Sequence, residues 1–142
     1  MKRFVLDASV ALRWFLDNPV PAYAAWVRKA MLRGAQARVP VLWHIEMANG
    51  LAVAERRGVL QAPEVEDSLL DIEEMLAGSI DDDEIVLGAR QVLAPARSFR
   101  LTAYDAVYLD LAQREGLPLA TLDEALRSAA RRAGVTVFDG MH

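Results

Sequence analysis

The sequence predicts an α/β sandwich built on a mostly parallel central sheet. Short apolar runs that suit buried strands alternate with longer segments of helical periodicity. At two places a strand-like run leads through an aspartate into a helix, as happens at the carboxyl edge of a parallel sheet. The chain has 142 residues, 54% of them hydrophobic, which is enough for one core. We therefore expect a single domain over residues 1–142.

Composition narrows the functional classes. The chain lacks cysteine, which excludes disulfides, thiolate zinc sites and a cysteine nucleophile. Only His44 and His142 are histidines, which disfavours a histidine-rich metal site and a paired-histidine ribonuclease mechanism. The net charge of −4 argues against a simple electrostatic nucleic-acid binder but leaves room for a local basic surface. No apolar run could span a bilayer or serve as a signal peptide, so we expect a soluble, cytoplasmic protein.

The first predicted strand, residues 3–6, leads directly to Asp7. A helical pattern begins at once, with Ser9 in its first turn, and ends near the turn-forming residues 17–19. Asp7 would stand at the carboxyl end of the strand, where open α/β sheets bind ligands. A helix cap, which contributes about 1 kcal/mol, explains this residue equally well. On this stretch alone, both interpretations stay open.

A second helix is predicted over residues 21–33. Trp14 and Phe15 on the first helix and Trp26 on the second provide more aromatic surface than two short helices usually need. Core packing is the favoured explanation, and a partner-binding groove is the alternative.

Residues 37–42 indicate a second strand, and a helix follows over residues 43–58. Glu46 and Asn49 are three residues apart and so share one face of that helix near its start. An acid and an amide among so many apolar residues suggest a polar pocket. An exposed helix face is an equally good explanation for Glu46.

Two acidic runs follow. The helix over residues 64–77 carries a charged face that we assign to solvent. Residues 81–84 are all acidic and precede an apparent helix over 85–96. We interpret them as charges that complement the helix dipole, because consecutive acids on one turn point in diverging directions and make a poor metal site.

Asp105 is the last of four residues, 102–105, that precede a predicted helix over residues 106–112. Thr102 and Asp105 form a plausible capping pair, which gives Asp105 a structural explanation.

Three further elements are predicted: a strand over residues 117–121, a helix over 125–133 and a last strand over 135–138. Thr121 and Glu124 fit a capping box at the start of this helix. That pairing leaves Asp123 without a capping role, which favours a functional one.

Four acids can therefore meet at one edge of the sheet. Asp7 and Asp123 each follow a strand, and Glu46 and Asp105 lie in early turns of helices that could begin at that edge. Like charges held together need a cation. Oxygen ligands without cysteine or histidine favour Mg²⁺ or Mn²⁺.

Four blocks of the sequence together resemble the PIN-domain ribonucleases, most closely the VapC toxins of bacterial and archaeal toxin-antitoxin pairs. The blocks are Asp7-Ala8-Ser9, Glu46-Met47-Ala48-Asn49, Tyr104-Asp105-Ala106-Val107-Tyr108-Leu109 and Thr121-Leu122-Asp123-Glu124. The resemblance spans residues 4–138. Each block is a weak signal alone, and the four in order are a strong one.

The resemblance implies a PIN-like α/β/α sandwich and a metal-dependent endoribonuclease that cleaves RNA. The implied acidic quartet is Asp7, Glu46, Asp105 and Asp123, with Mg²⁺ or Mn²⁺ as cofactor; Ser9, Asn49 and Thr121 match supporting positions. The resemblance also implies a cognate antitoxin and a homodimer. The alternative is a catalytically silent PIN-like interaction module, since fold alone does not establish activity. The intact quartet counts against that alternative.

Overall fold

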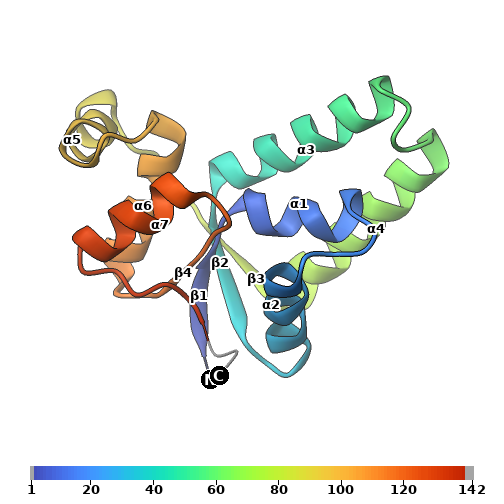
Figure 1. Cartoon of the computed structure of the whole chain (residues 1–142), viewed down its shortest axis with the longest axis horizontal. Helices are drawn as coiled ribbons and strands as arrows, with labels where there is room; N and C mark the ends of the chain where they lie inside the picture. Colours follow the sequence, from blue (N-terminus) through green and yellow to red (C-terminus); the bar gives the residue numbers. More distant parts are fainter. Residues whose placement is uncertain (1, 140–142) are drawn as a thin grey trace.

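The computed structural model describes residues 2–139 and shows an α/β/α sandwich (Figure 1). The strands β1 (Arg3–Leu6), β2 (Gln36–Pro40), β3 (Ile80–Asp83) and β4 (Leu119–Ala120) form one sheet in the order β3-β2-β1-β4. Every strand pair is parallel, which confirms the predicted fold class.

Seven helices flank the sheet in this part of the chain. They are α1 (Ala8–Leu16), α2 (Ala22–Leu32), α3 (Val41–Arg56), α4 (Ala62–Gly78), α5 (Ala89–Phe99), α6 (Ala103–Glu115) and α7 (Glu124–Arg132). In Figure 1, α1 to α4 lie on one side of the sheet and α5 to α7 on the other. Between residues 2 and 139, no helix is both long and apolar enough to cross a membrane.

The central strand β1 explains how the acid-bearing segments come together. Phe4, Val5 and Leu6 are fully buried, as expected for a strand covered by helices on both faces. Leu6 is in register with Ala120 of β4. Both strands stop at this point, so the residues that follow them emerge side by side at the carboxyl edge of the sheet.

The predicted helix start at residues 81–84 was wrong. Residues 81–83 belong to β3, which pairs with β2 as an edge strand of the sheet. Its charges suit an edge, where they discourage pairing with another chain. Asp83 is buried, and Arg114 and Arg38 approach its carboxylate to 2.8 and 3.8 Å. Those two arginines, which lie far away in sequence, supply the compensation that allows an acid inside this strand.

Other boundaries also differ from expectation. Helix α5 begins at Ala89 and continues to Phe99, past the predicted end at residue 96. The last predicted strand, residues 135–138, makes only a single parallel bridge, between Leu119 and Val137. Strand β4 is two residues long, so it offers little edge for a further strand to extend.

Candidate active site

Asp7 lies at the carboxyl end of β1 and is 4% exposed. It occupies the N-cap position of α1, yet its carboxylate makes no capping hydrogen bond. Its Oδ2 instead accepts hydrogen bonds from the hydroxyls of Ser9 and Thr121, both at 2.7 Å. Burial raises the pKa of Asp7, and these hydroxyl donors partly oppose that rise. The structure therefore disfavours the cap as the reason for this acid.

The two hydroxyls also fix the loop between β4 and α7. Ser9 Oγ accepts from the main-chain N–H of Leu122 at 3.0 Å, and Thr121 Oγ1 accepts from that of Asp123 at 3.0 Å. Each hydroxyl proton is thereby directed to Asp7, because each oxygen already accepts an amide. Arg127 supports the same loop by donating to the carbonyl of Thr121 at 2.7 Å. The loop that carries Asp123 is thus tied to Asp7.

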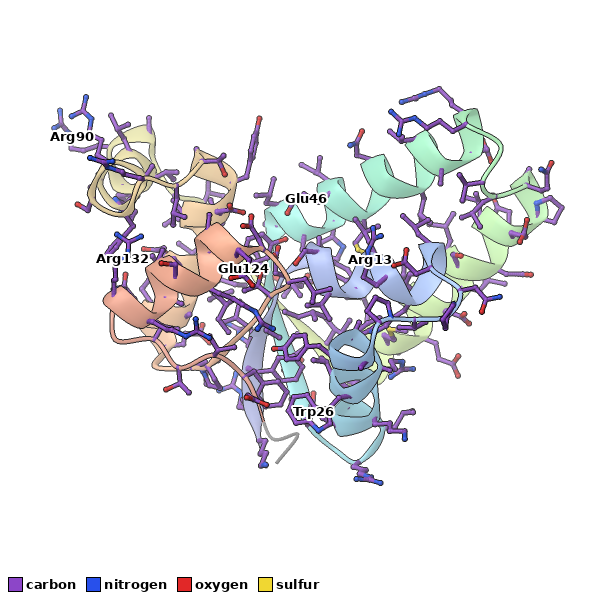
Figure 2. All side chains as sticks on the ribbon, in the orientation of Figure 1. Arg13, Trp26, Glu46, Arg90, Glu124 and Arg132 are labelled. Carbon is purple, nitrogen blue, oxygen red and sulfur yellow. The ribbon has the colours of Figure 1, made fainter. Side chains whose placement is uncertain are left out.

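Glu46 faces the sheet edge from the second turn of α3 (Figure 2). Its Oε1 accepts a hydrogen bond of 2.6 Å from the hydroxyl of Tyr108 on α6. Tyr108 is fully buried, and burial together with the charges of Asp7 and Glu46 raises its pKa, so it stays a neutral donor. No role for Tyr108 was predicted from the sequence. Its position three residues after Asp105, on the same face of α6, was the available signal.

Asp105 lies in the first turn of α6. Burial, followed by the neighbouring carboxylate of Asp123, raises the pKa of Asp105 from 3.8 to about 7. The charges of Asp7 and Glu46 act in the same direction. Such effects are strong only between groups separated by a few Å. The four acids therefore share one region, although each comes from a different element.

The capping interpretations had mixed outcomes. Thr102 is the N-cap of α6 and accepts from the N–H of Asp105 at 3.1 Å, as predicted. The capping box between Thr121 and Glu124 was wrong. Asp123 is itself the N-cap of α7, and its Oδ1 accepts from the amides of residues 125 and 126. The reason is that Thr121 is fully buried and bonded to Asp7, two positions before the N-cap.

The donor set suits a hard divalent cation. Asp7, Glu46, Asp105 and Asp123 offer only carboxylate oxygens, which are the ligands that Mg²⁺ and Mn²⁺ prefer. As they stand, no three acidic or histidine side chains within residues 2–139 form a ready metal site.

Within residues 2–139, no recorded side-chain hydrogen bond joins Asn49 to any of the four acids. Asn49 is exposed on α3, one turn beyond Glu46, and lines a cavity beside that residue. The structure thus brings together Asp7, Ser9, Glu46, Asp105, Thr121 and Asp123, and it leaves Asn49 at their margin.

The sequence matches a known protein family, and the fold resembles solved structures. The family model described as PIN domain matches residues 4–132. The structure resembles that of PAE2754 from Pyrobaculum aerophilum, with a TM-score of 0.65, 24% identity and coverage of 90% of this chain and 79% of that one. It also resembles FitAcB from Neisseria gonorrhoeae, with a TM-score of 0.58, 21% identity and coverage of 96% of both chains. No curated protein sequence matches the chain.

Proposed function

The chain belongs to the PIN domain family, whose members are generally nucleases, and on that premise we propose that it is a metal-dependent endoribonuclease. The observation that carries the proposal is the meeting of four acids from four elements at the carboxyl edge of the sheet. A silent interaction module would gain nothing from carboxylates that repel one another and that need buried donors to hold them in place.

In this proposal, Asp7, Glu46, Asp105 and Asp123 hold Mg²⁺ or Mn²⁺. When bound, the cation supplies an acidified water for attack on phosphorus and neutralises charge on the phosphate. Ser9 and Thr121 hold the Asp7 carboxylate in place through their hydroxyls, and Tyr108 does the same for Glu46.

A group of arginines on and around α5 and α7 supports a polyanionic substrate. Residues 85–104 and 125–138 contain six arginines and no acid. The two segments lie together, since Arg132 donates to the carbonyl of Phe99 and its guanidinium lies 5.8 Å from that ring. Figure 2 shows Arg90 and Arg132 on the same side of the molecule. None of the ion pairs recorded within residues 2–139 involves Arg90, Arg97, Arg100, Arg131 or Arg132. Arginine is well suited to phosphate.

The reaction products test the proposed chemistry. Because water rather than the RNA's own 2′-hydroxyl is the nucleophile, cleavage should leave a 5′-phosphate and a 3′-hydroxyl. Purified protein should cleave single-stranded RNA in the presence of Mn²⁺, and a chelator should abolish the reaction. RNA ligase should join the fragments without prior treatment of their ends, because it requires a 5′-phosphate and a 3′-hydroxyl. An RNA with a 2′-deoxy sugar at the scissile position should still be cut. Products with a 2′,3′-cyclic phosphate would refute the mechanism.

We further propose that the protein is the toxin of a toxin-antitoxin pair, that it forms a homodimer and that an antitoxin segment inhibits it. A groove of about 710 Å³ between α1, α2 and α4 supports the antitoxin site. Its lining includes Trp14, Phe15, Met31, Leu32 and Met75, with Leu32 71% exposed. The lining also includes Arg28, Asp71 and Glu74, so an amphipathic helix could match both its apolar and its charged residues.

Trp26 packs against the core, as the favoured explanation predicted, and it does not line the groove. Its ring packs between Tyr23 and Phe138, at 6.1 and 5.0 Å between centroids. Of the three aromatic residues, only Trp14 and Phe15 line the groove.

Trp14 therefore provides the test of the antitoxin site. In a Trp26→Phe variant, the remaining tryptophans are Trp14 in the groove and Trp43, which is 1% exposed. The product of the adjacent reading frame, if it is the antitoxin, should reduce access of a soluble quencher to Trp14 on binding. Unchanged quenching in a complex that demonstrably forms would place the inhibitor elsewhere.

A further inference from the structure

A cavity of about 420 Å³ adjoins the acids on the side of Glu46. Its walls are the side chains of Leu12, Leu42 and Ile45, the ring of Tyr104, and the polar groups of Glu46 and Asn49. Binding sites for small organic groups have about this size, with mostly apolar walls and a few polar groups.

Two residues of the cavity wall are large and hydrophobic although most of each side chain is exposed, so packing in the core does not explain them. Tyr104 is 62% exposed and Ile45 is 63% exposed. Tyr104 lies in the first turn of α6, directly before Asp105, and Ile45 directly precedes Glu46. An aromatic ring and an aliphatic side chain therefore flank the cavity next to two of the four acids.

Gly50 and Leu12 both line the cavity and lie in close contact. A Cβ atom at position 50 would lie 2.5 Å from Cδ2 of Leu12, so a larger residue there would require the Leu12 side chain to shift. Because both residues line the cavity, such a shift would change the shape of its wall.

We propose that this cavity binds one unpaired nucleobase of the RNA, next to the scissile phosphate, by stacking it on Tyr104. The inference rests on the proposed function and adds to it a subsite for the substrate. Glu46 belongs both to the cavity and to the acid cluster, so a nucleotide whose phosphate lies at the acids would carry its base to this wall. Unpaired bases are commonly recognised by stacking on aromatic side chains. The amide of Asn49 can donate to and accept from the edge of a base.

The test compares RNA binding by matched variants, all carrying Asp7→Asn to slow cleavage. The probe is a short single-stranded RNA that contains the cleavage site mapped with the unmodified protein. Tyr104→Ala should weaken binding about tenfold, in line with the loss of one base stack. Tyr104→Phe should bind as well as the parent, because the ring rather than the hydroxyl makes the contact. Leu70→Ala, equally exposed at 62% on α4, is the control and should change nothing.

An abasic RNA isolates the base itself. With the base next to the scissile phosphate removed, the parent should bind about tenfold more weakly and Tyr104→Ala should lose nothing further. If Tyr104→Ala weakens both RNAs equally, or neither, the subsite is wrong although the protein still cuts RNA. If sedimentation shows that Tyr104→Ala dissociates a dimer without changing RNA affinity, the cavity is an interface between copies instead. Absence of any RNA cleavage by the unmodified protein would overturn the proposed function, and the subsite with it.

Discussion

Asp7→Asn should reduce RNA cleavage by about 100-fold or more, because a bound cation contributes several kcal/mol to such a transition state. Asparagine keeps the shape of the side chain and an oxygen that can accept from Ser9 and Thr121, but it removes the charge of the most buried of the four acids. Initial rates with Mg²⁺ and with Mn²⁺ measure the effect.

A matched control is available on the same helix. Asp17→Asn also removes one negative charge from the end of α1, where the aspartate pairs with Arg13 at 2.7 Å. It should cleave RNA at the parental rate. Both variants should remain folded, and the metal-free Asp7→Asn protein should melt no lower than the parent, because burial already disfavours the Asp7 charge. Parental cleavage by Asp7→Asn would remove this residue from the site.

Asp105→Asn should separate the active-site interpretation from the cap. If Asp105 shares a cation site with the other acids, the variant should lose cleavage, bind Mn²⁺ more weakly and melt at the same temperature or higher when metal-free. If Asp105 only favours the helix start, the variant should lose about 0.3 to 1 kcal/mol of stability and cut RNA normally. Thr102, which caps α6 through its own hydroxyl, is unchanged in the variant.

The pH dependence of stability provides a second measurement that compares Asp105→Asn with the unmodified protein. The pKa of Asp105 in the folded protein, about 7, exceeds its ordinary value of 3.8, so the folded state holds this proton more tightly. The metal-free protein should therefore lose stability as the pH rises between those two values. Because the carboxyl is half-buried, solvent screening should limit the loss to about 1 kcal/mol. Asp105→Asn should flatten this dependence, and saturating Mn²⁺ should oppose it in the parent. An unchanged pH profile in the variant would contradict the shared site.

Local sequence was sufficient for the parts of the fold that depend on local pattern. The buried run before Asp7, the helical face of Glu46 and the strand before Thr121 each carry their own signal, and the parallel sheet follows from their alternation. Strand β3 could not be predicted in this way. Its acids are tolerated because Arg38 and Arg114 approach Asp83, and those contacts exist only in the folded chain.

In the candidate site too, some features could be predicted from local sequence and others depend on contacts between distant residues. The convergence of the acids could be argued from strand ends alone. The bonds from Thr121 to Asp7 and from Tyr108 to Glu46 could not, because they join residues 114 and 62 positions apart in sequence. Asp123 illustrates the limit: it caps α7 and lies beside Asp105 at once, so capping and function were never exclusive.

The central claim is that Asp7, Glu46, Asp105 and Asp123 hold a divalent cation together. Anomalous diffraction from crystals of the protein soaked in Mn²⁺ tests it most directly. The claim predicts a manganese peak within ligand distance of oxygens from at least three of these four carboxylates. A peak at the acidic strand β3, or no peak among the four acids while the protein cleaves RNA with Mn²⁺, would contradict it.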